Sequence, residues 1–295
     1  MTMQNTPLLM SKILGRGAKL DPDVEVVTMQ AEGTHRQTLK QTWDRANQLA
    51  HALSTHGIEI GDRIASFMWS NYRHLELYQG VPSMGSVLHT LNIRLSSTDL
   101  EYIINHAGDK IIFADEDLLP LLEPLWGKVP CVELLVICRH GEGGESSFEN
   151  QVDYEDFIAA QATEYDWPEI DETSPMGLCY TSGTTGKPKG VMYTNRSTYL
   201  HTMAECLTDS LGLSSLDSVL GIVPMFHAMG WGLPFCASML GCKQVMPHRF
   251  MTPDAFLQLI HDEKVTISAG VPTIWQGVRA TLEANPAKYD LSALT

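Results

Sequence analysis

The sequence contains none of the short motifs that mark the commonest catalytic and metal sites. Its six cysteines form no Cys-x-x-Cys pair, and its eleven histidines include no His-Glu-x-x-His and no evident zinc-ligand spacing. No Gly-x-Ser-x-Gly occurs, so nothing supports a nucleophilic-serine hydrolase. These absences argue against a protein-bound transition metal, and cysteines in apolar runs are typical of reduced thiols in an intracellular protein.

Basic residues are scarce relative to acidic ones. The chain has 20 Lys and Arg against 35 Asp and Glu, which gives a formal net charge of -15. Such a charge opposes general attraction to nucleic-acid phosphates or anionic membrane surfaces. With 295 residues, 44% of them hydrophobic, the chain can bury a large core. A phosphate-binding site must therefore be a local exception to the overall charge.

Segments that would indicate export or membrane insertion are also lacking. No secretory signal is present, because Lys12 interrupts the apolar stretch 7–14. The basic first twenty residues weakly resemble a mitochondrial transit peptide, but their apolar spacing equally fits a first amphipathic helix, which we prefer. The uncharged stretch 219–242 is long enough to cross a bilayer, yet its prolines and glycines divide it into shorter pieces. We expect a buried strand, a loop and a helix there, in a cytoplasmic protein.

Apolar residues alternate between helical and extended spacing along the chain, which predicts an α/β fold of stacked, mostly parallel sheets flanked by helices. A break rich in proline and acidic residues at 167–175 suggests two subdomains, 1–170 and 171–295. Helices are expected at 39–53, 72–84, 96–107, 154–162, 195–211, 253–263 and 272–283. Strands are expected at 64–68, 87–90, 110–114, 134–138, 177–181, 219–223 and 265–269.

The most informative segment is 180–191, Tyr-Thr-Ser-Gly-Thr-Thr-Gly-Lys-Pro-Lys-Gly-Val, between the apolar runs 176–180 and 191–193. Small hydroxyl residues and glycines let backbone and side-chain donors approach an anion closely. No acidic residue occurs from 173 to 204, so this loop lies in a locally basic segment of an otherwise acidic chain. Because Pro188 follows Lys187, it is not a Walker A motif. On these features alone, the loop either wraps a polyphosphate or is a surface turn.

Residues 180–191 resemble the phosphate-loop signature of the adenylate-forming superfamily, which includes acyl-CoA synthetases, luciferases and peptide-synthetase adenylation domains. Residues 224–234, Pro-Met-Phe-His-Ala-Met-Gly-Trp-Gly-Leu-Pro, resemble the segment beside the acyl pocket in the fatty-acyl branch. Segments 91–96, 174–180 and 269–273 are also similar to that branch. Several motifs agree, so the resemblance extends over nearly the whole chain.

The resemblance implies a role for each matching residue. Thr181 would be a ligand to Mg²⁺, and Lys189 would add positive charge beside the phosphates of ATP; Lys187 is a weaker candidate for a phosphate contact. His227 would line the acyl and nucleotide site, and Trp231 would gate the fatty-acid tunnel. The β- and γ-phosphates would be held by Ser182, Gly183, Thr184, Thr185 and Gly186.

The same resemblance implies an ATP-dependent ligase that forms an acyl-adenylate and then an acyl-CoA, with coenzyme A as a substrate and medium- to long-chain fatty acids as the expected acids. Its relatives continue well beyond residue 295 with an adenine-binding strand, a glutamate ligand to Mg²⁺, a ribose-binding aspartate and a small C-terminal domain that carries a catalytic lysine. We find no counterpart of these in the sequence. The chain is therefore expected to be an incomplete N-terminal domain that is inactive alone.

Two other functions stay open. The chain could belong to an aryl-CoA ligase, another carboxylate–CoA ligase or a peptide-synthetase adenylation domain. It could also be a non-catalytic module that binds a nucleotide or an acyl ligand. Relatives of the fatty-acyl branch are often homodimers, so a homodimer is possible. Neither nucleic acid nor stable membrane insertion is expected.

Overall fold

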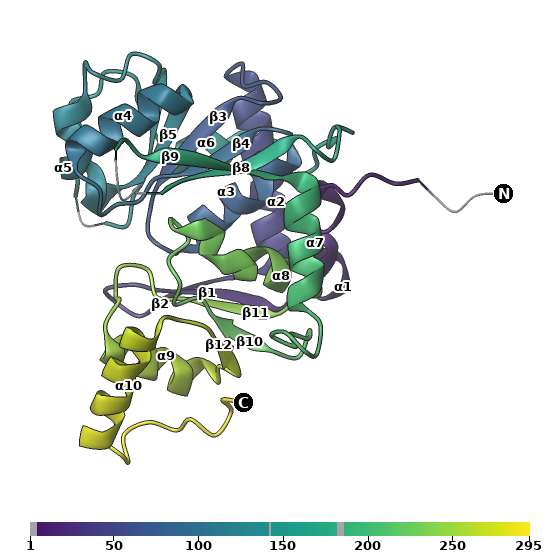
Figure 1. Ribbon diagram of the computed structural model, residues 1–295, viewed down its shortest axis with the longest axis vertical. Helices are drawn as coiled ribbons and strands as arrows, with labels where there is room; N and C mark the ends of the chain where they lie inside the picture. The colour runs from purple at the N-terminus through teal and green to yellow at the C-terminus, as the bar shows by residue number, and fades with distance from the viewer. Residues whose placement is uncertain (1–4, 142, 182–185) are drawn as a thin grey trace.

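The computed structural model describes residues 5–141, 143–181 and 186–295, and it has the expected α/β architecture. Two sheets lie one above the other with helices between and around them (Figure 1). The first sheet has seven strands in the order β7-β6-β5-β3-β4-β8-β9, and the second has five in the order β12-β10-β11-β1-β2. Pairing is parallel throughout except for β8 with β9 and β1 with β2, which confirms the mostly parallel prediction.

The strands of the seven-stranded sheet are β3 Arg63–Phe67, β4 Val87–Thr90, β5 Asp109–Asp115, β6 Leu134–Cys138, β7 Gln151–Asp153, β8 Pro175–Thr181 and β9 Lys189–Thr194. Those of the five-stranded sheet are β1 Glu25–Met29, β2 Thr34–Thr38, β10 Ser218–Leu220, β11 Lys243–Met246 and β12 Ile267–Ser268. The α-helices are α1 Arg16–Leu20, α2 Leu39–Thr55, α3 Tyr72–Ser83, α4 Ser97–Ala107, α5 Leu119–Leu122, α6 Tyr154–Ala159, α7 Asn195–Glu205, α8 Leu233–Leu240, α9 Pro253–Glu263 and α10 Pro272–Ala284. Single 3-10 turns are η1 Met10–Lys12, η2 Glu116–Leu118, η3 Glu123–Leu125 and η4 Ala228–Gly232.

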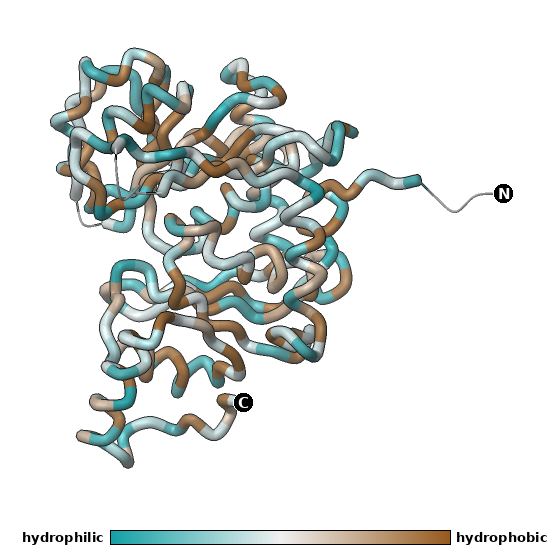
Figure 2. Tube along the Cα trace, viewed as in Figure 1, coloured by the Kyte–Doolittle hydropathy of each residue, from teal (hydrophilic) through white to brown (hydrophobic). Residues whose placement is uncertain are grey.

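Helix α3 lies between the two sheets, and all of its residues are buried. Its side chains Leu75, Leu77 and Val81 belong to one apolar cluster that also contains Val26 of β1 and Leu88 of β4. A helix enclosed on every side is buried around its whole circumference, unlike a surface helix with one apolar stripe. Figure 2 shows apolar stretches on strands of both sheets, as expected for sheets covered on both faces.

The stretch 219–242 folds as predicted into a buried strand, a loop and a helix, namely β10, η4 and α8. Among the helices in the described part of the chain, none combines the length and apolar character needed to cross a membrane.

Several expected elements differ from the structure; for example, the strand expected at 265–269 is shortened to Ile267–Ser268. The helix predicted at 195–211 ends at Glu205, because the apolar residues that would extend it, Leu207 and Leu211, are exposed and have no core to pack against. The expected first amphipathic helix is divided into η1 and α1. Each sheet contains strands that precede residue 170 in the sequence and strands that follow it, so the two sheets do not correspond to the two predicted subdomains. The division into 1–170 and 171–295 stays a prediction.

Candidate functional site

The ends of the phosphate-loop segment are held together by the antiparallel pair of β8 and β9. Thr181 is the last residue of β8 and Lys189 the first of β9, and the two are register partners. Both side chains are exposed, and Gly186 between them has a φ of 107°, which favours glycine. The hairpin therefore presents Thr181 and Lys189 at one edge. Predicted phosphate-binding residues Ser182, Gly183, Thr184 and Thr185 lie outside the described residues.

The hairpin is braced against helix α4 by aromatic contacts. The Tyr180 hydroxyl lies 2.6 Å from Nδ1 of His106, and burial raises the pKa of Tyr180 to about 12, so its phenol stays protonated at neutral pH. Gly190 leaves room for this ring, since a Cβ there would lie 3.2 Å from the Tyr180 Cζ atom. These contacts hold β8 and β9 against α4.

A cavity of about 780 Å³ lies between α4 and the end of the loop. Nζ of Lys187 lies 4.6 Å from the ring centroid of Tyr102, so Lys187 is directed toward α4. Lys189 forms no ion pair with any described residue and remains open to an anion. The cavity is lined by Thr98, Asp99, Glu101, Tyr102, Asn105, His106, Gly186, Lys187 and Pro188.

The second predicted segment begins with a firmly anchored stretch. The backbone N–H of Met225 donates to Ser70 Oγ at 3.1 Å, and the Tyr78 hydroxyl donates to the Met225 carbonyl. The next residue, Phe226, is buried, whereas His227 is exposed and has no side-chain hydrogen bond within the described chain. The motif thus places His227 at the surface of a rigid segment, before η4.

The turn η4 has left-handed backbone geometry. Ala228, Met229 and Trp231 have φ values of 46°, 51° and 55°, and glycines occupy positions 230 and 232. Left-handed geometry costs roughly 1–2 kcal/mol for each non-glycine residue, so the surrounding structure must hold the turn. The turn leaves the Trp231 side chain 41% exposed.

Trp231 lines an apolar cavity of about 410 Å³ between β9, α7, η4 and α8. Met229 packs against β8 at Gly177, where an added Cβ would lie 3.0 Å from its Cε atom. Because β9 also carries Lys189, one strand connects this cavity with the phosphate-loop hairpin. His227 does not line the cavity. The lining residues are Tyr193, Ser197, Thr198, His201, Ala228, Met229, Trp231, Gly232 and Phe235.

Sequence reasoning missed the contributions of α4 and α7 to these cavities. His201 and Glu205 on α7 have the i, i+4 spacing of neighbours on a helix, and His201 Nδ1 lies 3.8 Å from Glu205 Oε2. Burial raises the pKa of Glu205 to about 7. The spacing is visible in the sequence, but which side of the helix faces the cavity depends on tertiary packing.

Thr181 could supply one of the oxygen ligands that a magnesium ion needs. Its hydroxyl is exposed at the end of β8 and has no partner among the described residues, so it is free to act as a ligand. Mg²⁺ requires six oxygens, usually including carboxylates, phosphates and waters. The sequence has no acidic residue between 173 and 204, so any carboxylate ligand must come from elsewhere.

Comparisons with known proteins agree with this arrangement. The sequence pattern of a family described as "AMP-binding enzyme" matches residues 15–295. The medium-chain-fatty-acid–CoA ligase of Ectopseudomonas oleovorans is 39% identical over 288 residues, which are 97% of this chain and 53% of that protein. The 3-methylmercaptopropionyl-CoA ligase of Ruegeria pomeroyi is 40% identical over 287 residues, 96% of this chain and 53% of that protein.

The fold is also shared with solved structures. A long-chain-fatty-acid-CoA ligase from Archaeoglobus fulgidus superposes with a TM-score of 0.86 at 20% identity, covering 99% of this chain and 57% of that one. The chain thus has the fold of the N-terminal domain of adenylate-forming enzymes, and it spans about half the length of the curated relatives it matches. With both motifs placed on that fold and the family pattern matching almost the whole chain, the protein belongs to the AMP-binding enzyme family, together with the acyl-CoA ligases.

Proposed function

We propose that the whole protein is an ATP-dependent acyl-CoA synthetase that acts on medium- to long-chain fatty acids. The observation that carries the proposal is the apolar cavity lined by Met229 and Trp231, beside the hairpin that carries Thr181 and Lys189. An apolar cavity of this size suits a flexible acyl chain, and an adjacent basic loop suits a polyphosphate. The similarity to a medium-chain ligase supports the same substrate class.

In the proposed reaction a carboxylate oxygen of the acid attacks the α-phosphorus of ATP, and the bond to the bridging oxygen breaks to release pyrophosphate. The sulfur of coenzyme A then attacks the acyl carbon and displaces AMP. Lys189 provides positive charge where the transition state gathers negative charge, and residues 182–186 hold the β- and γ-phosphates. Mg²⁺, with Thr181 as one ligand, would neutralise phosphate charge. His227, which is exposed and lies outside the apolar cavity, would face the carboxyl end of the acid rather than its chain, and Trp231 would control access of the chain to that cavity.

Three further properties belong to this proposal. Residues 1–295 alone do not complete the reaction, because the residues that the resemblance places after position 295 are needed. The complete protein is cytoplasmic, in keeping with the six cysteines, none of which forms a disulfide. It forms a homodimer.

The alternative substrates are aromatic or other small acids, and the alternative role is a binding module without catalysis. The Ruegeria pomeroyi relative bears the name of a ligase for 3-methylmercaptopropionate, so relatives of similar identity differ in their acid. The apolar lining around Trp231 favours a fatty acid.

A panel of acids tests the substrate class. The complete protein is incubated with ATP, Mg²⁺, coenzyme A and fatty acids of graded length, together with benzoate and 3-methylmercaptopropionate, and pyrophosphate release is measured. We expect the highest kcat/KM with a medium or long fatty acid and a changed length preference in Trp231→Ala. The control Leu216→Ala, at a side chain 91% exposed, should keep the wild-type preference. A preference for either small acid would refute the proposed substrate.

A further inference from the structure

Three side chains that commonly bind metals meet outside the two cavities described above. Asp115 is the last residue of β5, His140 follows β6, and His248 follows β11. Because β5 and β6 are adjacent parallel strands, their carboxyl ends bring Asp115 and His140 together. His248 comes from the other sheet and is held there by a backbone bridge to Ser70. The cluster therefore joins the two sheets.

The distances suit a small cation. His140 Nε2 lies 2.9 Å from Asp115 Oδ1, and His248 Nε2 lies 3.9 Å from Asp115 Oδ2. The candidate ligand atoms all lie within 4.8 Å of one another. Ligands at about 2.1 Å from a tetrahedral zinc ion are about 3.4 Å apart, a separation between the two observed distances. Small side-chain shifts would form the site.

The buried Nε2 atom of His248 points to a missing ligand. The side chain is only 4% exposed, yet this nitrogen has no hydrogen-bond partner in the described part of the chain. Leaving a buried polar atom unsatisfied costs about 1–3 kcal/mol. The backbone of His248 is also left-handed, with a φ of 53°, at a further cost of about 1–2 kcal/mol. A metal bound to Nε2 would satisfy the nitrogen and account for its position.

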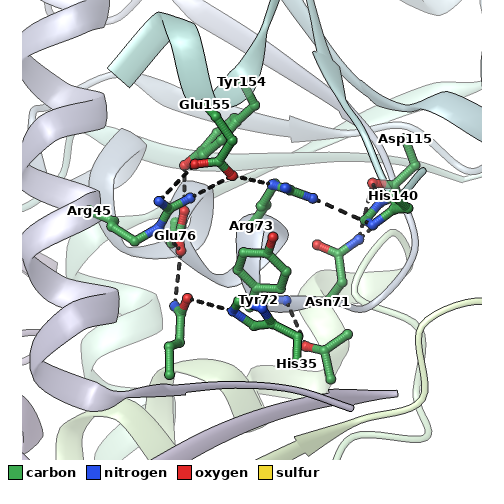
Figure 3. Close-up of polar contacts among 12 residues, drawn as sticks. His35, Arg45, Asn71, Tyr72, Arg73, Glu76, Asp115, His140, Tyr154 and Glu155 are labelled. Atoms are coloured by element: carbon green, nitrogen blue, oxygen red, sulfur yellow. Dashed lines mark hydrogen bonds and ion pairs between the residues drawn. The ribbon is translucent and has the colours of Figure 1, made fainter. Parts of the chain in front are cut away.

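The carboxylate of Asp115 is already oriented by neighbouring groups. The Trp69 backbone N–H donates to Oδ2 at 2.8 Å, and the Asn71 amide donates to both oxygens at 2.9 and 3.1 Å. Figure 3 shows Asn71 and His140 converging on Asp115. Ligands of metal sites are commonly fixed by such outer hydrogen bonds. With His140 included, each oxygen of Asp115 accepts two hydrogen bonds, so the ion would take the position on Oδ1 to which His140 donates.

Neighbouring positive charges must be accommodated, because the guanidinium groups of Arg73 and Arg249 both act on His248. Nη1 of Arg73 lies 3.4 Å from Nδ1 of His140, so in the metal-free protein Nδ1 accepts this contact and Nε2 carries the proton donated to Asp115. Binding a metal at Nε2 would move this proton to Nδ1, and the Arg73 guanidinium would withdraw from the ring because both groups would then be donors. Arg73 keeps its anchor, because its Nε donates to Glu155 at 2.8 Å.

We propose that Asp115, His140 and His248 form a binding site for a divalent transition metal of the zinc class, with water as the fourth ligand. One carboxylate and two imidazoles form a donor set typical of zinc and of its neighbours in the first transition row. The site is structural, since it connects the seven-stranded sheet to the five-stranded sheet and lies outside the two cavities of the candidate active site. It is independent of the proposed ligase activity. Asp115 and His140 are 25 residues apart, and His140 and His248 are 108 apart, so no short ligand motif in the sequence indicates the site.

Metal content and spectroscopy test the proposal. The complete protein is stripped with a chelator, dialysed without ATP or magnesium, and titrated with Zn²⁺ or Co²⁺. We expect one ion per chain and, with Co²⁺, the intense visible absorption of tetrahedral coordination. His248→Asn should weaken binding at least about tenfold. The control His261→Asn changes a partly buried histidine outside the cluster and should bind zinc as the wild type does.

Folding of the variants is checked by circular dichroism, and His140→Gln serves as a second ligand variant. The wild-type titration decides the question even if both variants fold poorly. No stoichiometric binding by the wild type would overturn the proposal, as would unchanged binding in a folded His248→Asn variant. Zn²⁺ should also raise the Tm of the stripped wild type and leave that of His248→Asn unchanged.

Discussion

At the residue scale, Glu205 is the clearest case of a side chain whose charge conflicts with its surroundings. It ends α7 next to the apolar cavity lined by Trp231, and its Oε2 has no hydrogen-bond partner among the described residues. Gly232 lies directly against it, since a Cβ there would lie 2.8 Å from Oε2. Desolvation by burial raises the pKa of Glu205 to about 7. The neutral acid is therefore the form that the fold prefers.

The raised pKa predicts a pH-dependent stability. Between about pH 4.5 and 7 the folded state holds more protons at Glu205 than the unfolded state does, so the free energy of unfolding falls as pH rises through that window. We expect Glu205→Gln to be more stable than wild type at pH 8 by about 1–2 kcal/mol, allowing for screening by water, with the difference shrinking toward pH 5. Urea unfolding at several pH values measures this.

A matched control for that experiment is Glu32→Gln, which removes an exposed carboxylate. Its stability should follow the wild type at every pH. If the advantage of Glu205→Gln over wild type were the same at pH 5 and pH 8, the raised pKa of Glu205 would be wrong.

At the element scale, a buried ionic network connects β2, α2, α3 and α6. Glu76 on α3 accepts hydrogen bonds from Arg45 Nε at 2.8 Å, from Gln37 Nε2 at 2.9 Å and from the Tyr154 hydroxyl at 2.6 Å. Arg45 also contacts Glu155, as Figure 3 shows. Glu76 is fully buried, so its charge depends on these partners.

Removing the Glu76 carboxylate should be costly, because Arg45 and the Tyr154 hydroxyl lose their buried acceptor. We expect Glu76→Ala to lower the free energy of unfolding by about 3–5 kcal/mol. Glu76→Gln should cost less, since an amide oxygen still accepts one of these hydrogen bonds. The exposed pair of Lys40 and Asp44 provides the comparison, where Asp44→Ala should cost under about 1 kcal/mol. Equal losses in Glu76→Ala and Asp44→Ala would contradict the buried network.

Helices α2 and α3 approach closely at Gly80. A Cβ there would lie 2.9 Å from the Ala46 carbonyl oxygen and 3.3 Å from Leu49 Cδ2. Backbone cannot move aside easily, so we expect Gly80→Ala to destabilise the protein by about 1–3 kcal/mol despite its better helix propensity. Gly277→Ala in α10 meets only the edge of the Pro253 ring, and its denaturation midpoint should change little. A Gly80→Ala variant as stable as wild type would show that the helices can separate.

Sequence patterns predicted elements best where apolar residues recur over a full strand or helix. β6, with five apolar residues, and α9, which begins at a Thr252 cap and Pro253, were both expected. The polar strand β2 was missed, because its position depends on pairing with β1 rather than on an apolar pattern. The same limit applies to the candidate site: contiguous motifs predicted roles for Trp231 and Lys189, whereas the positions of His201 and the Asp115 cluster depend on tertiary contacts.

At the scale of the whole molecule, the two sheets and the helices between them support two cavities, one lined by residues 186–188 just before β9 and one apolar cavity near the other end of β9. The chain covers about 53% of its medium-chain relative, so the reaction is proposed for the complete protein. We expect purified residues 1–295 to form no acyl-CoA above background in a coupled assay with ATP, Mg²⁺ and a fatty acid. Robust product formation by this chain would contradict that expectation.

The most direct test of the proposed function is acid-dependent pyrophosphate release by the complete protein, with and without coenzyme A, compared with its Lys189→Ala variant. We predict release that requires the fatty acid, and a fall in kcat/KM of roughly 10²–10³-fold in Lys189→Ala, as for the loss of one group that stabilises transition-state charge. Lys264→Ala, a change at a lysine remote from the hairpin and paired with Asp290, should release pyrophosphate at the wild-type rate. No release with any acid, or release unaffected by Lys189→Ala, would contradict the account.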